Sequence, residues 1–203
     1  MCYSAEVSFG TFTFVAIIAS FLWYRNTKTD RAIALILIVV VLMQLIEGVL
    51  WLYPDCDITN KNFSTAIPII LYLQPLLINA IVAFYAAGWS SGYTIIAFLF
   101  LGILPFQLFH IYQRYGKCVT TSNGHLDWSP IIGDVDPIGV LPEFIYNAAM
   151  VFPFLTLKNK LFGLSYITSS IVSRFGIGGA YPQTWPSLWC HFVNGLAVLA
   201  LFT

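Results

Sequence analysis

Residues 32–51 read AIALILIVVVLMQLIEGVLW, and Glu47 is the only charged residue among them. Their number matches the roughly 20 apolar residues that a helix needs to cross the hydrocarbon core of a bilayer. Long apolar runs of this kind are typical of transmembrane helices. The stretch therefore predicts a membrane-spanning helix with one ionisable side chain inside it.

The composition of the whole chain agrees with this interpretation. Of 203 residues, 59% are hydrophobic and 9% are charged, whereas a soluble domain carries about 25% charged residues. Nine basic residues balance nine acidic ones, so the net charge does not favour nucleic acid as a partner. We expect a multi-pass integral membrane protein whose first partner is the lipid bilayer.

The same length criterion predicts an all-α bundle of seven transmembrane helices in a single transmembrane domain, residues 1–203. The predicted spans lie near residues 9–25, 32–53, 65–87, 92–113, 137–157, 161–178 and 186–203. The sixth is short and polar, so a six-span bundle is the alternative. Residues 114–136 are rich in Gly, Asp, Ser and Thr and predict an exposed loop with His125 in solvent.

Basic residues in the short loops set the predicted orientation, because Lys and Arg collect on the cytoplasmic side of a membrane. The loop after the first span carries Arg25, Lys28 and Arg31, and the loop after the fifth carries Lys158 and Lys160. With seven spans these two loops share one face. The N-terminus is then expected outside and the C-terminus in the cytoplasm.

All four cysteines, Cys2, Cys56, Cys118 and Cys190, lie at or near the outer face in this orientation. Disulfides form in the oxidising environment that an outer face meets. Four cysteines allow three pairings, and loop geometry favours Cys56 with Cys118 and Cys2 with Cys190. The alternative is that some of them are ordinary small buried residues.

Polar side chains inside the predicted spans carry most of the functional information. An ionisable group in hydrocarbon is costly and faces a partner or a water-filled cavity. The members of this set, several of them three or four residues apart on one helical face, are Gln44, Glu47, Gln74, Asn79, His110, Glu143, Asn147, Arg174, His191 and Asn194. Arg174 is the natural partner for Glu47 or Glu143. Because the ionisable members fall within roughly two turns of the outer boundary, the set predicts one outward-facing pocket.

Three functions are compatible with such a pocket. The first is a transporter or channel for a small solute, an ion or a proton. The second is a non-catalytic structural subunit of a virion or organelle membrane complex, whose polar side chains only hold the helices together. The third is a metal-dependent intramembrane hydrolase with zinc among His110, His191, Glu47 or Glu143. Against the third, Ser187 stands where a His-x-x-x-His pair with His191 needs its first histidine.

Several segments of the chain also carry a family resemblance. The N-terminal MCYSAEVS, then YRNTKTDRAIA, MQLIEGVLW, LQPLL and finally SLWCHFVN resemble an uncharacterised family of multi-pass membrane proteins of about this length, with members in large DNA viruses, bacteria and protists. The resemblance implies a membrane bundle and no established activity. The family's recurring positions would here be Cys2, Ser4, Gln44, Glu47, Trp51, Cys56, Gln74, Pro75, Ser187, Trp189, Cys190 and Asn194. His110, Arg174 and His191 are not among them.

Together these patterns predict a membrane protein that handles a small solute or ion, with the pocket centred on Gln44, Glu47, Gln74 and Glu143. We expect a protein that is not an enzyme and that has neither a cofactor nor a bound metal. For further partners we expect a second copy of the chain or a larger membrane assembly.

Overall fold

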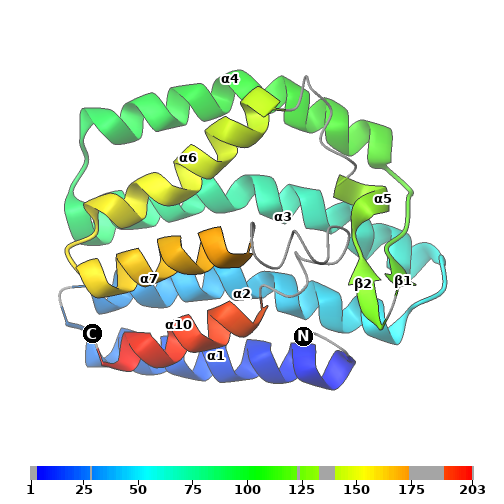
Figure 1. The fold of residues 1–203 in the computed structure, drawn as a ribbon, viewed down its shortest axis with the longest axis horizontal. Coiled ribbons are helices and arrows are strands. Elements are labelled where there is room, and N and C mark those ends of the chain that lie inside the picture. The colour runs from blue at the N-terminus through cyan, green and yellow to red at the C-terminus, as the bar shows by residue number, and fades with distance from the viewer. Residues whose placement is uncertain (1–3, 28, 123, 133–139, 174–189, 203) are drawn as a thin grey trace.

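The computed structural model describes residues 4–27, 29–122, 124–132, 140–173 and 190–202, and at 140–143, 190 and 191 it describes the backbone alone. The described part is mostly helical (Figure 1). Its helices are α1 (Ala5–Arg25), α2 (Asp30–Leu52), α3 (Ile58–Val82) with a wider final turn η1 (Ala83–Ala87), α4 (Ser91–Arg114), α5 (Ser129–Ile132), α6 (Val140–Thr156), α7 (Lys160–Ile171) and α10 (Cys190–Leu201). Two short strands, β1 (Thr120–Ser122) and β2 (His125–Asp127), form an antiparallel hairpin.

Four helices of the described part are long and apolar enough to cross a membrane: α1, α2, α3 with η1, and α4. Two shorter apolar segments, Phe144–Thr156 and Phe192–Leu201, belong to α6 and α10. The predicted sixth span coincides with α7 as far as Ile171, and residues 174–178 of that span lie outside the described residues. An all-α fold with apolar helices of membrane-spanning length is therefore present.

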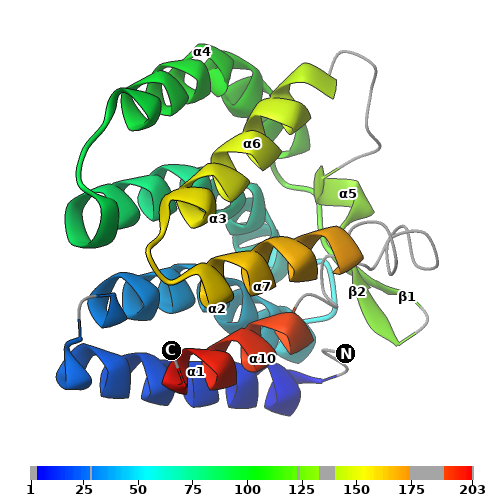
Figure 2. The same cartoon turned by 60° about the vertical axis from the view of Figure 1, so that its left-hand side comes forward.

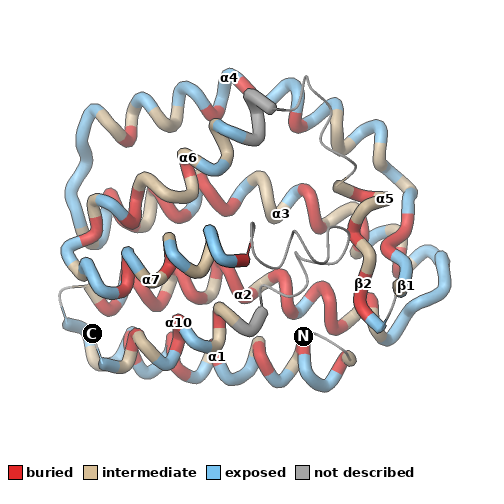
Figure 3. The backbone as a smooth tube through the Cα atoms, viewed as in Figure 1, coloured by how far each residue is buried: buried red, intermediate tan, exposed pale blue. Residues whose placement is uncertain are grey.

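The helices pack side by side, with α2 in the middle and α4 at the edge (Figure 2). α2 contacts α1, α3 and α10, while α6 lies between α3 and α7. In its most apolar stretch α2 is 72% buried and α4 only 17%. Figure 3 shows the same contrast along the two backbones. Because α4 exposes large apolar side chains such as Phe98, Phe106 and Phe109, its outer face suits contact with lipid tails.

The pairing of α1 with α2 is the closest in the bundle. One face of α1 is buried at intervals of three or four residues: Ser8, Thr11, Val15, Ile18 and Leu22. Near the N-terminal end of α1, the Phe9 ring lies against Gly48 of α2, so that a Cβ placed on Gly48 would come within 2.7 Å of the ring. Gly48 is therefore a position where only a missing side chain permits this helix contact.

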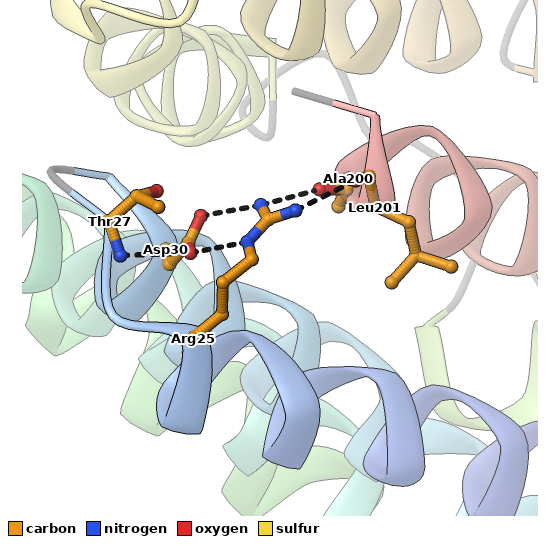
Figure 4. Close-up of polar contacts among 5 residues, drawn as sticks. All are labelled: Arg25, Thr27, Asp30, Ala200 and Leu201. Atoms are coloured by element: carbon orange, nitrogen blue, oxygen red, sulfur yellow. Dashed lines mark hydrogen bonds and ion pairs between the residues drawn. The ribbon is translucent and has the colours of Figure 1, made fainter.

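Arg25 and Asp30 join the other ends of α1 and α2 (Figure 4). Arg25 Nε donates to Asp30 Oδ2 at 2.7 Å and Nη2 to Oδ1 at 2.8 Å. Arg25 Nη1 also donates to the Leu201 carbonyl oxygen at 2.8 Å, at the end of α10 where carbonyls lack helical partners. Asn26 takes a left-handed conformation and ends α1. One guanidinium thus ties three helix ends together.

Residues 118–122 and 124–132 form a cap over the ends of α2 and α3 that the turn at Cys56 connects. Cys118 is bonded to Cys56 in the turn between those helices, at a sequence separation of 62. The pairing of Cys56 with Cys118 predicted from the sequence is thus present, while Cys2 and the Cys190 side chain lie outside the described residues. The buried face of the cap, Val119, Leu126, Trp128 and Ile131, packs on Met43, Ile46, Leu50 and Ile67.

Buried hydrogen bonds hold the cap on α3. Asn60 Nδ2 donates to the Tyr53 and Val119 carbonyl oxygens at 2.8 and 3.2 Å. The Ser64 hydroxyl accepts from the Val119 N–H at 2.9 Å and donates to Asn60 Oδ1. Because an unpaired polar group is costly inside a protein, this closed set of bonds fixes the start of the cap.

The prediction of an exposed loop with a solvated His125 is therefore wrong. His125 is 7% exposed and its neighbour Leu126 is 1% exposed, and burial lowers the pKa of the imidazole below its ordinary value. The segment is polar in overall composition, but its four apolar residues Val119, Leu126, Trp128 and Ile131 pack against the helix ends.

Replacing Gly48 by alanine is expected to lower the free energy of unfolding by about 1–3 kcal/mol, because the new methyl group would overlap the Phe9 ring. Gly10 is the matched control, since a Cβ there would meet nothing within 4 Å. Gly10→Ala should leave the protein equally stable or stabilise it by up to about 1 kcal/mol. The measurement is thermal unfolding in detergent, and equal midpoints for the two variants would contradict the contact.

Replacing both Cys56 and Cys118 by serine is expected to lower the free energy of unfolding by about 2–4 kcal/mol, because the cap would lose its covalent link. Cys56→Ser alone should give nearly the same loss, since one serine already prevents the bond. Thermal unfolding followed by tryptophan fluorescence would report it, with Trp128 buried in the cap. Unchanged midpoints in both variants would mean that the cap is held without the disulfide.

Candidate functional site

The polar residues predicted to form one pocket lie on several helices of the bundle. Gln44 and Glu47 are on α2, Gln74 and Asn79 on α3, His110 on α4, Asn147 on α6 and Asn194 on α10. Arg174 and the side chains of Glu143 and His191 lie outside the described residues. Most of the described members are of two kinds: those that hydrogen-bond to neighbouring elements, and those whose buried polar side chain has no hydrogen-bond partner among the described residues.

The two polar residues of α3 belong to the first kind. Gln74 is 5% exposed and donates from Nε2 to the Val39 carbonyl oxygen of α2 at 3.2 Å. Asn79 donates from Nδ2 to the Ala149 carbonyl oxygen of α6 and to the Pro75 carbonyl oxygen, both at 2.7 Å. Amides of this kind join helices in a bundle, so Gln74 and Asn79 hold α2, α3 and α6 together.

His110 of α4 is also held by its neighbours. Its Nε2 lies 2.8 Å from the Ile132 carbonyl oxygen of α5, and its Nδ1 lies 3.1 Å from the Tyr72 hydroxyl of α3. A carbonyl oxygen can only accept, so Nε2 carries the proton and Nδ1 accepts from Tyr72. The ring joins α3, α4 and the cap, and both of its nitrogens are in use.

Glu47 belongs to the second kind. It is 0% exposed, and among the described residues neither carboxylate oxygen has a hydrogen-bond partner. The side chain of Gln44, one turn earlier on α2 and 3% exposed, lies next to Glu47 and acts on its carboxyl group. An ionised carboxylate is costly in such an environment unless a proton or another positive charge neutralises it.

Ser8 of α1 is a second buried polar group without a partner, and it was not among the predicted site residues. It is 0% exposed, and its hydroxyl oxygen has no hydrogen-bond partner in the described part of the chain. The contact between Phe9 and Gly48 brings Ser8 to the level of Glu47 on the neighbouring helix. The signal in the sequence was the spacing of Ser8 and Thr11, which fall on the same face as Val15.

A shallow groove of about 460 Å³ opens between α1 and α10. Its floor contains a hydrogen bond from Asn194 Nδ2 to the Thr11 hydroxyl oxygen, 3.1 Å long. The remaining lining residues are small or apolar: Val7, Gly10, Phe14, Gly195 and Val198. Asn194 thus joins α10 to α1 rather than pointing toward α3, and Asn147 is exposed on the surface of α6.

The described residues contain no group of three or more His, Cys, Asp or Glu side chains that could hold a metal ion. Among the described residues, the amide of Gln44 is a neutral group beside Glu47. The chemistry available at this level is that of one carboxylate among neutral oxygens. Such a set binds a proton or a singly charged cation more readily than a divalent one.

Comparison with known proteins gives no relative: no family model, no curated protein and no solved structure matches this chain.

Replacing Glu47 by methionine is expected to raise the free energy of unfolding by about 1–2 kcal/mol in a choline buffer, because the variant no longer buries an unpaired carboxyl group. Asn79→Leu is the contrasting variant. It should lower the free energy of unfolding by about 1–2 kcal/mol, since the Pro75 and Ala149 carbonyls lose a donor. Thermal unfolding in detergent measures both. A loss of stability in Glu47→Met as large as that in Asn79→Leu would mean that Glu47 is a structural residue.

Proposed function

We propose that this chain is a seven-span integral membrane protein, with its N-terminus outside and its C-terminus in the cytoplasm, that binds and passes a small cation, the proton included, at Glu47. Four helices of spanning length support the membrane part of the proposal. Three further helices, α6, α7 and α10, begin or end within the remaining predicted spans.

The distribution of charge and sulfur supports the proposed orientation. The end of the bundle that carries Arg25 also carries the end of α10 and is opposite the end with the cap (Figure 1). A short loop rich in Lys and Arg favours the cytoplasm, whereas the Cys56–Cys118 bond favours an oxidising compartment. Both features agree on which end is outside.

One observation carries the functional proposal: Glu47 is fully buried in the middle helix of the bundle and neither of its oxygens has a partner in the described part of the chain. A residue that served only to hold helices together would use its polar atoms to do so, as Asn79 does. A buried carboxyl without a partner costs stability, and such costs are characteristic of functional sites.

A second candidate function is that of a structural subunit of a larger membrane assembly, of a virion or an organelle. The hydrogen bonds of Gln74, Asn79 and His110 favour it, because each joins two or more elements. In that role the partners would be further membrane proteins or other copies of this chain, packed against exposed apolar helices such as α4. A metal-dependent hydrolase would need histidines and carboxylates brought together, and no observation in the described residues favours it.

Flux measurements separate the two candidates. Purified full-length protein in liposomes should carry sodium ions or protons down an imposed gradient, and Glu47→Gln should reduce this flux at least about tenfold, because the site loses its charge. Glu6→Gln is the matched control: Glu6 is exposed in the first turn of α1, and the flux should not change.

Protein-free liposomes give the background rate in the same experiment. Flux at this background for sodium ions and protons alike, together with stable copurification in a large assembly, would contradict the transport proposal and favour the structural one.

A further inference from the structure

Ser8, like Glu47, has a buried side-chain oxygen without a hydrogen-bond partner in the described part of the chain. Ser8 lies on the buried face of α1, the face that packs on α2 and α10. Its side chain is 0% exposed, and its oxygen has no hydrogen-bond partner among the described residues. A serine on this face would ordinarily donate to the carbonyl one turn earlier in its own helix, as the exposed Ser20 does to the Ala16 oxygen at 2.8 Å. Ser8 does not, so its hydroxyl is left for another partner.

The register of α1 against α2 sets the height of this hydroxyl. Phe9 touches Gly48, and the two helices are antiparallel because a short turn connects them at Arg25 and Asp30. Ser8 and Glu47 are each one residue from the contact, on opposite sides of it. At about 1.5 Å of rise per residue they are separated by only about 3 Å along the helix axes.

The carboxyl oxygens of Glu47 and the hydroxyl oxygen of Ser8 have no hydrogen-bond partner in the described part of the chain, so they do not hydrogen-bond to one another. A protonated carboxyl beside a hydroxyl would be expected to form such a bond, because the alternative is two unsatisfied polar groups in an apolar interior. Oxygens that share a metal cation behave differently: each lies at about 2.3–2.6 Å from a hard cation of this size and they need not touch. The arrangement therefore favours a cation between the groups over a proton on one of them.

The total charge of the candidate ligands Glu47, Ser8 and Gln44 limits the kind of cation that they can bind. Glu47 supplies one negative charge, and Ser8 and Gln44 supply neutral oxygens from the two adjoining helices. Divalent calcium and magnesium are held by a larger set of oxygen ligands, often with several carboxylates. A single carboxylate is neutralised by a singly charged ion, which leaves no net charge in the apolar interior.

We propose that Glu47 and Ser8 together bind a dehydrated monovalent cation of sodium size between α1 and α2, with Gln44 as a further neutral oxygen ligand. This proposal rests on the proposed function and names the ion and the second helix that it involves. Binding joins α1 to α2 at their outer ends, just as Arg25 and Asp30 join them at the inner ends.

Equilibrium binding of radioactive sodium to the purified full-length protein tests this, at constant ionic strength with choline as the replacing cation. Wild-type protein should bind one sodium ion per chain, and Glu47→Gln should bind none. Ser8→Ala should weaken binding about tenfold, because the ion loses one of its few oxygens. Ser20→Ala is the matched control on the exposed side of α1 and should bind as the wild type does.

A second measurement covers the case in which Ser8→Ala does not fold. Sodium should raise the thermal unfolding midpoint of the wild-type protein relative to choline, since an ion that binds only the folded state stabilises it. The rise should be absent in Glu47→Gln.

The outcomes separate this inference from the proposed function. If Ser8→Ala folds and binds sodium as tightly as the wild type, Ser8 is not a ligand and the inference fails, although Glu47 remains the site. If sodium neither binds nor stabilises while Glu47-dependent proton flux is present, the ion is a proton and the inference again fails. If Glu47→Gln changes neither binding nor flux, both proposals fail.

Discussion

The register of α1 against α2 is the constraint on which the proposed site depends. It is set at both ends of the helix pair, by two different interactions. At the end where the two helices are connected, Arg25 and Asp30 form a bidentate pair. At the opposite end, the Phe9 ring fits against a helix position without a side chain, Gly48. If α1 were shifted by one residue relative to α2, another residue of α1 would take the place of Ser8 opposite Glu47. Ser8 would then point about 100° away around α1, because a helix has about 3.6 residues per turn. The proposed site would then lose its ligand from α1.

The cap supplies the second condition, because it covers the C-terminal end of α2. Leu50 and Ile46, one on each side of Glu47, pack under Leu126 and Trp128 of the cap. The Cys56–Cys118 bond and the hydrogen bonds of Asn60 and Ser64 hold this cover on α3.

The sequence predicts the elements of this fold better than their contacts. Long apolar runs predict helices at the right places because hydropathy depends on neighbours along the chain, and the pairing of Cys56 with Cys118 follows from two loops at one end of a bundle. The pocket predicted from the sequence contains residues that hydrogen-bond to neighbouring elements as well as Glu47, which has no hydrogen-bond partner among the described residues. Gln74, Asn79 and His110 are polar positions within apolar helices just as Glu47 is, and only packing reveals that their atoms bond to neighbouring elements.

Ser8 and His125 both show the limits of sequence patterns, because each is buried where its sequence context does not indicate burial. Serine is common on exposed helix surfaces, so its burial at position 8 becomes evident only from the partner helix. His125 lies in a polar stretch, yet the hairpin turns it inward. Both outcomes depend on contacts between residues far apart in the sequence, which composition and periodicity do not encode.

A density map of the purified protein in sodium chloride, at a resolution that shows bound ions, tests the central claim most directly. The account predicts a peak in contact with the carboxylate of Glu47 and the hydroxyl of Ser8, and predicts that the peak is lost when choline replaces sodium. A side chain of the protein in contact with the Glu47 carboxylate under both conditions, such as the guanidinium of Arg174, would contradict it.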